Sequence, residues 1–138
     1  MLEDWIIRKK EIEDSKNSLQ GADLCNAKLM QAKLDGASLE DADLTAAYLI
    51  KADLSGANLS RADLTQAVLS EADLSGVDFE NTELTDTFLN GANLKGALNL
   101  TCDQLDLANY DKDTIFPDYI KIKWSPDGYC ECFENNKR

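Results

Sequence analysis

The sequence is dominated by a repeat of five residues. From Leu19 to Leu94, sixteen consecutive positions spaced five residues apart hold leucine, except that Phe79 occupies one of them. Three residues after each of these positions, from Ala22 to Ala97, thirteen of the sixteen residues are alanine. A step of five residues advances about 140° around an α-helix, so the leucines would lie on every side of a helix. The repeat therefore excludes a helix over these residues.

The order of residues within one unit predicts a short strand followed by a turn. Alanine, a polar residue and leucine alternate, which places both apolar side chains on one face of an extended chain. The two residues after each leucine are rich in Gly, Asn, Asp and Ser, which favour turns. Repetition of this unit without a reversal of direction predicts a solenoid with leucine and alanine along its axis.

Outward-facing positions recur every 20 residues, which indicates that four units complete one coil. Glycine recurs at positions 36, 56, 76 and 96, and threonine at 45, 65 and 85. Two further sets have the same spacing: an acidic column of Asp23, Asp43, Asp63 and Glu83, and an apolar ladder of Tyr48, Val68 and Phe88. The 20-residue recurrence therefore predicts that residues 17–97 form an all-β solenoid, a β-helix of about four coils.

The units resemble those of the pentapeptide-repeat family, whose motif reads A(D/N)Lxx, as in ADLSG at 52–56 and ADLTQ at 62–66. This resemblance implies a right-handed quadrilateral β-helix with leucine and alanine pointing inward. The sequence departs from the motif at Val77, Thr82 and Thr87, which replace alanine, so we expect a wider core there. The string QLDLANYDKDTIFPD at 104–118 is similar to the segment that closes the repeat in many bacterial, especially cyanobacterial, members.

Both ends of an open β-helix expose unpaired strand edges, so each end is expected to carry a cap. Residues 1–16 are expected to form a helical cap, because Leu2, Trp5, Ile6 and Ile12 share one face of a helix. A helix on a membrane surface would show a similar pattern. The segment has five acidic and four basic residues, which favours the cap.

The chain leaves the repeat frame at residue 99, so residues 98–138 are expected to form a C-terminal cap. Thr101 or Asp103 is suited to begin a short helix that carries Leu105 and Leu107. Residues 119–133 alternate on either side of the turn SPDG at 125–128, which predicts a β-hairpin. Its expected facing pairs are Trp124 with Cys130, Lys123 with Glu131, and Ile122 with Cys132.

The four cysteines are too few and too irregularly spaced for a disulfide scaffold. We favour the interpretation that Cys130 and Cys132 are free thiols on the buried face of the hairpin. The main alternative is a disulfide from Cys102 to Cys130 or Cys132. A zinc site is the weakest reading, because zinc needs about four ligands and the chain has no histidine. We therefore expect neither a metal nor a cofactor.

Composition narrows the classes of function. The chain has 26 acidic and 14 basic residues and a net charge of −12, which argues against direct binding to nucleic acid or to an anionic membrane. The lack of histidine removes the usual general base, and the repeat contains no nucleophile–base pair, so we expect no enzyme. The sequence shows neither a signal-peptide pattern nor a long apolar run, which predicts a cytoplasmic location.

The favoured hypothesis is a non-enzymatic structural or protein-interaction module, a monomer or weak homodimer, with an unidentified protein partner. The acidic column is expected to be a solvated face or to attract Ca²⁺ or a basic protein. The apolar ladder is expected to be covered by the C-terminal hairpin or, alternatively, by a second copy of the chain.

The family resemblance implies a second hypothesis. Some members form an acidic rod that resembles duplex DNA and binds DNA gyrase. Residues 17–97 contain 13 acidic and 5 basic residues, so most of the negative charge of this chain lies in the repeat. The alternative function is therefore an acidic DNA mimic that binds DNA gyrase or another DNA-binding protein.

Overall fold

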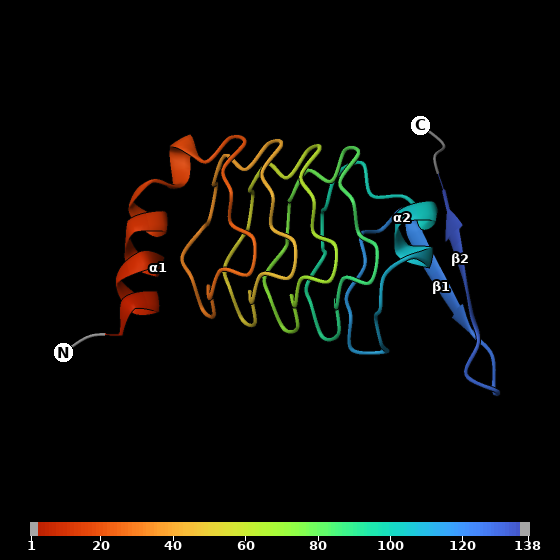
Figure 1. The fold of residues 1–138 in the computed structure, drawn as a ribbon. Coiled ribbons are helices and arrows are strands. Elements are labelled where there is room, and N and C mark those ends of the chain that lie inside the picture. Colours follow the sequence, from red (N-terminus) through yellow and green to blue (C-terminus); the bar gives the residue numbers. More distant parts are fainter. Residues whose placement is uncertain (1–2, 136–138) are drawn as a thin grey trace.

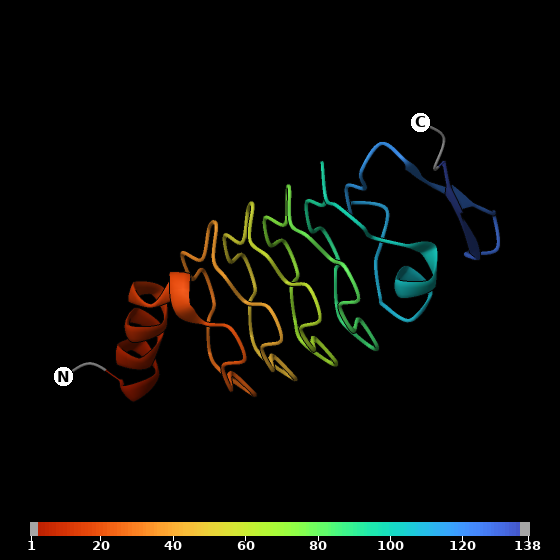
Figure 2. The same ribbon diagram turned by 90° about the horizontal axis from the view of Figure 1, so that it is seen from above.

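The computed structural model describes residues 3–135, which form an elongated solenoid with a cap at each end (Figure 1). Helix α1 spans Asp4–Asp14, and a short 3₁₀ turn follows at Lys16–Ser18. After the repeats come helix α2 at Cys102–Asp106 and a hairpin of strands β1, Ile120–Trp124, and β2, Cys130–Glu134. The view from above shows α1 and the hairpin at opposite ends of the stack (Figure 2).

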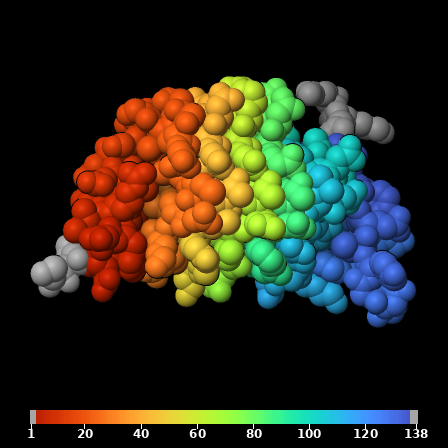
Figure 3. Space-filling model, viewed as in Figure 1, coloured from red at the N-terminus to blue at the C-terminus, as the bar shows by residue number. Residues whose placement is uncertain are grey.

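The solenoid is built from residues 20 positions apart that pair through parallel bridges. Asp43 pairs with Asp63 on one side of the rod, and Asn58 pairs with Asp78 on another. The Asp63 N–H donates to the Ala42 carbonyl at 3.0 Å, and this pattern recurs along the stack. The sequence colours consequently form successive bands across the rod (Figure 3). The predicted 20-residue spacing is confirmed.

Every unit turns its corner through a residue with positive φ, two positions after the leucine. Glycine occupies six of these corners, with φ between 66° and 73°. Other residues adopt the same conformation, including Asn26 at 61°, Ala46 at 58° and Arg61 at 59°. This left-handed region is unfavourable for residues that carry a Cβ. The regular coil therefore imposes the conformation on whichever residue stands at the corner.

Leucine and alanine fill the axis of the solenoid, as predicted. Phe79, the one exception in the leucine series, is also fully buried. Thr82 and Thr87 stand at alanine positions and enter the core. Their hydroxyls donate to the carbonyls of Leu59 and Leu64, each at 2.7 Å. The two threonines therefore bring polar groups into the core that are hydrogen-bonded there.

Helix α1 lies at the N-terminal end of the rod (Figure 1). Ile12 is buried, and Trp5 and Ile6 are partly buried. Leu2, which the sequence places on the same face, lies outside the described residues. The predicted N-terminal helix is present, and of its four expected contact residues Ile12 belongs to the buried core.

Side chains from α1 also bond to the open edge of the first coil. Glu13 Oε2 accepts a hydrogen bond from the Lys33 backbone N–H at 2.8 Å. Lys9 Nζ donates to the Met30 carbonyl at 3.2 Å. In later coils the equivalent backbone groups form hydrogen bonds with the preceding coil. The first coil has no coil before it. The helix therefore satisfies groups that would otherwise form an unpaired strand edge.

Helix α2 begins at the residue after Thr101, which decides between the two caps that the sequence allowed. Thr101 Oγ1 accepts from the Gln104 N–H at 3.1 Å, and Gln104 Oε1 accepts from the Thr101 N–H at 2.8 Å. This reciprocal pair is a capping box. Leu105 is buried, whereas Leu107 follows the helix and is exposed, so α2 buries only one of the two expected leucines.

The predicted hairpin register is confirmed by the pairing of β1 with β2. The described pairs include Trp124 with Cys130, Lys123 with Glu131 and Ile122 with Cys132.

The predicted position of the hairpin is wrong, because it lies at the C-terminal end of the rod beside α2 (Figures 1 and 2). Ile120 is buried there, and Tyr119 Oη bonds to both the N–H and the carbonyl of Leu100, at 2.8 and 2.9 Å. These contacts anchor the hairpin to the end, so Tyr48 and Phe88 remain 44% and 41% exposed.

Candidate interaction face

The acidic column runs along one side of the solenoid, with its members joined by parallel bridges from Asp23 to Glu83. The carboxylates are held by the residue two positions later in the same unit. Asp63 Oδ1 accepts from both the N–H and the hydroxyl of Thr65, at 2.9 and 2.6 Å. Glu83 accepts from the Thr85 hydroxyl. These bonds restrict the geometry of the column, because each held carboxylate is tied to the residue two positions later.

These bonds also act on the ionisation of the column. Hydrogen bonds from the side chain and then the N–H of Thr45 hold the pKa of Asp43 below its ordinary value. Cys25 occupies the position equivalent to Thr45 in the preceding coil. Desolvation and then the carboxylates of Asp43 and Asp23 raise the pKa of the Cys25 thiol. A thiol with a raised pKa is a weak nucleophile at neutral pH. The negative column therefore disfavours the thiolate form of Cys25.

The apolar ladder lies on the next side of the same coils, because each ladder residue follows a column residue by five positions. Tyr48 pairs with Val68, and Val68 pairs with Phe88. Strand spacing places neighbouring members about 4.8 Å apart. Both aromatic side chains are more than two-fifths exposed, and Val68 is partly buried. The structure thus brings the predicted site residues together as two parallel rows.

None of the ion pairs found among residues 3–135 includes a carboxylate of the acidic column. They join Lys10 to Asp14, Lys16 to Asp35, Lys51 to Glu71, and Arg61 to Asp41. The column carboxylates therefore have no oppositely charged side chain paired with them among the described residues.

Other kinds of site are not found in the described part of the chain. Residues 3–135 contain no cluster of three or more acidic, cysteine or histidine side chains placed to hold a metal ion. Nor do they contain a helix long and apolar enough to cross a membrane.

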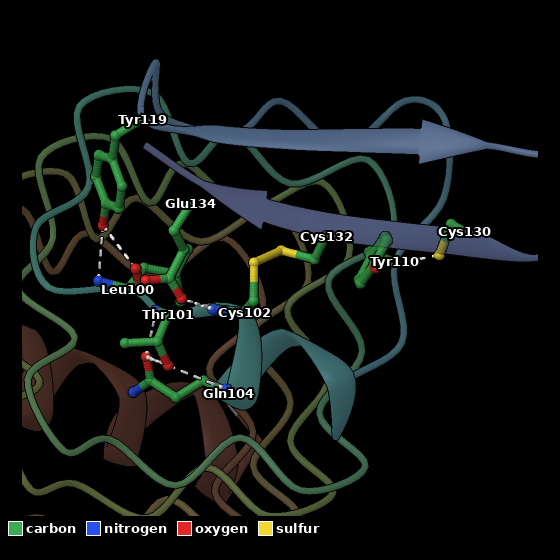
Figure 4. Close-up of a disulfide and its surroundings, with 9 residues drawn as sticks. All are labelled: Leu100, Thr101, Cys102, Gln104, Tyr110, Tyr119, Cys130, Cys132 and Glu134. Atoms are coloured by element: carbon green, nitrogen blue, oxygen red, sulfur yellow. Dashed lines mark hydrogen bonds between the residues drawn. A yellow bond between two sulfur atoms is a disulfide. The ribbon is translucent and has the colours of Figure 1, made fainter. Parts of the chain in front are cut away.

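The favoured expectation for the hairpin cysteines is wrong for one of them. Cys132 forms a disulfide with Cys102 (Figure 4), whereas Cys130 and Cys25 are free thiols. The hairpin register places Cys130 and Cys132 on the same face, and the sequence does not distinguish which of them reaches α2. Docking of the hairpin against the first turn of α2 decides the pairing, which the spacing of the cysteines does not reveal.

Comparison with known proteins agrees with this geometry. Residues 15–45, 27–66 and 62–98 match the family described as pentapeptide repeats, in eight copies. The chain belongs to the pentapeptide-repeat family. The resemblance seen in the sequence is therefore confirmed, and with it the β-helix architecture of the family. A search of curated proteins finds no match.

Solved structures of pentapeptide-repeat proteins are similar to this chain. The protein alr5209 from Nostoc Pcc 7120 is 31% identical over 84% of this chain and 88% of its own, with a TM-score of 0.48. QnrB1, a plasmid-mediated fluoroquinolone resistance protein, is 22% identical over 67% of this chain, with a TM-score of 0.53. This chain spans half the length of the QnrB1 chain. At that identity the likeness to QnrB1 shows the fold alone.

Proposed function

We propose that this pentapeptide-repeat chain is a non-enzymatic protein-interaction module whose binding face combines the acidic column and the apolar ladder. The observation that carries the proposal is the exposure of Tyr48 and Phe88, stacked with partly buried Val68, beside carboxylates that form no ion pair within residues 3–135. A row of exposed apolar side chains on a rigid surface is typical of a face that a partner covers. The proposed module has about four coils within 17–97 and caps at 1–16 and 98–138.

The chemistry of the two rows defines the partner. The ladder offers aromatic and aliphatic surface, and the column offers a line of negative charge along its border. A complementary protein surface presents apolar side chains flanked by lysine or arginine, since opposite charges guide association and reject wrong partners. A net charge of −12 disfavours nucleic acid and anionic membranes. We also propose a cytoplasmic location and a monomeric or weakly dimeric state.

Capture with crosslinking from the native host tests the acidic column. The bait proteins are the wild-type chain, Asp43→Lys/Asp63→Lys, and the matched control Asp53→Lys/Asp73→Lys. The control makes the same charge change on another side of the rod, where each aspartate also accepts bonds from the residue two positions later. We expect one specific partner to be lost only with the column variant. An identical set of partners for all three baits contradicts the proposal for the column.

The apolar ladder needs its own variants. Tyr48→Ser/Phe88→Ser removes both exposed rings and leaves the buried leucines and the column in place. We expect the same specific partner to be lost, with the circular-dichroism spectrum unchanged. If the wild-type chain instead sediments as a dimer and this variant as a monomer, a second copy occupies the ladder and the heterologous partner is rejected.

The acidic DNA mimic is the second candidate, and the stacked carboxylates of the column favour it. They recur at the inter-strand spacing of about 4.8 Å along a rigid rod. A DNA-gyrase supercoiling assay at low and moderate salt tests this candidate, because charge mimicry weakens as salt screens it. Inhibition that disappears with Asp43→Lys/Asp63→Lys supports the mimic. No effect of excess protein at either salt concentration rejects it.

A further inference from the structure

The C-terminal cap contains a covalent bond between two elements that are distant in the sequence. Cys102 is the first residue of α2, Cys132 lies in the middle of β2, and their separation is 30 residues. Their Cα atoms are 5.5 Å apart, and the sulfur bridge lies between the helix and the strand (Figure 4). Both cysteines are partly exposed. The bridge therefore lies near the surface of the C-terminal cap.

The two strands of the hairpin are held in different ways. Strand β1 has Ile120 buried in the core, and Tyr119 just before it bonds to Leu100. Strand β2 presents mostly exposed residues, including Phe133 at 49%. Its described bonds to α2 are the disulfide and the hydrogen bond from the Cys102 N–H to Glu134 Oε1. The disulfide is therefore the covalent link between β2 and α2, beside the pairing of β2 with β1 and the contact of Cys130 with Tyr110.

A cleft lies at the junction that this link spans. It has a volume of about 730 Å³ and is lined by Thr82 and Leu98 from the repeats, Gln104 from α2, and Tyr119 and Glu134 from the hairpin. Because Glu134 forms part of its wall, movement of β2 away from α2 widens this cleft. An isolated two-stranded hairpin is at best marginally stable in water. A hairpin that loses its covalent link is thus poised to open locally while the coils stay folded.

We propose that the Cys102–Cys132 disulfide is a thiol-exchange site at which a dithiol reductant opens the C-terminal cap. One thiolate of the dithiol attacks a cap sulfur and forms a mixed disulfide, and its second thiol then displaces that sulfur. The dithiol leaves as a disulfide, and the two cysteines gain two electrons and two protons. Cys130, whose Sγ lies 3.2 Å from Tyr110 Oη, is a thiol before and after the reaction.

The compartment then determines the state of the cap. Oxidising compartments preserve such bonds, whereas glutathione and thioredoxin keep cytosolic thiols reduced. In the proposed cytoplasmic location the cap is open, and exposure to an oxidant closes it. The site does not depend on the acidic column or the apolar ladder, which lie on the sides of the rod.

Hydrogen exchange on the full chain tests the proposal. The chain is oxidised with oxidised glutathione, and exchange is measured by mass spectrometry with and without dithiothreitol. We expect amides of 119–134 to exchange roughly tenfold faster or more after reduction, while amides of 40–80 are unchanged. Cys130→Ser should respond like the wild-type chain. Cys102→Ser/Cys132→Ser should exchange rapidly in both conditions.

Three results would overturn the proposal. Equal protection of 119–134 in the oxidised and reduced chains means that noncovalent contacts alone hold the cap. Faster exchange throughout 40–80 means that the bond supports the whole rod rather than opening a cap. Four titratable thiols in the denatured chain after treatment with oxidised glutathione mean that the bond does not form. The comparison on the wild-type chain keeps the test decisive even if the serine variants fail to fold.

Discussion

Thr82 offers a sharp test of how the solenoid accommodates a polar residue on its axis. Its hydroxyl donates to the Leu59 carbonyl at 2.7 Å, and that carbonyl also accepts from the Ala62 N–H at 2.9 Å. Thr82→Val removes the hydroxyl but leaves the carbonyl its second partner, so the expected loss in the free energy of unfolding is about 1 kcal/mol or less. Thr82→Ala also removes a buried methyl group worth about 0.8 kcal/mol, so its expected loss is about 2 kcal/mol.

Urea unfolding followed by circular dichroism gives both values from the shift in midpoint, provided that the slope is unchanged. The chain contains its own replicate, because Thr87 makes the same bond to Leu64, whose carbonyl also accepts from the Ala67 N–H. The order wild type, valine, alanine should therefore recur at both positions. A valine variant as unstable as the alanine variant, or more stable than the wild type, refutes the reasoning.

Three further predictions concern the cap, the corners and the acidic column. Cys132→Ala removes a cross-link that closes a 30-residue loop, and chain entropy predicts a loss of about 3.6 kcal/mol in the free energy of opening the C-terminal cap relative to the oxidised wild type; equal hydrogen-exchange protection of 119–134 in the two proteins contradicts this. Gly56→Ala adds a Cβ that meets no atom within 4 Å, but the residue stays at φ +70°, so the left-handed backbone alone lowers the free energy of unfolding by about 1–2 kcal/mol. The reverse change at another corner, Ala46→Gly, should not destabilise the protein. An unchanged urea midpoint for Gly56→Ala contradicts the assigned backbone strain. The pKa of Asp43 is depressed on folding, so its stabilisation is complete above the unfolded pKa of about 3.9 and declines as pH falls through the folded pKa. Thr45→Val should raise this pKa in an NMR titration, and an unchanged titration contradicts the assigned cause.

Local patterns predicted much of the fold because their physical basis is local. Alternation of alanine and leucine sets which side chains point inward, and the 20-residue recurrence sets which residues stack. The same applies to the register of the hairpin, in which the turn at 125–128 determines that Ile122 faces Cys132. The choice between Thr101 and Asp103 remained open, because both residues are good helix caps and only the capping box with Gln104 separates them.

The errors arose where two elements distant in the sequence meet. Covering the exposed ladder with the hairpin was reasonable from composition, but the burial of Ile120 and the bonds of Tyr119 dock the hairpin at the end of the rod. The pairing of Cys132 with Cys102 follows from the same docking. Spacing alone does not show which of two cysteines on one strand face lies opposite α2.

For this protein, the sequence by itself determined the solenoid, the residues on its axis, and the membership of the acidic column and the apolar ladder. A repeat that keeps its frame for sixteen units carries its register in every unit, so no long-range contact is needed to read it. The tertiary structure alone decided which edge groups α1 satisfies, where the hairpin docks and which cysteines bond. Those features depend on single contacts between segments that have no repeat to place them, and the ladder stays exposed because the hairpin is anchored elsewhere.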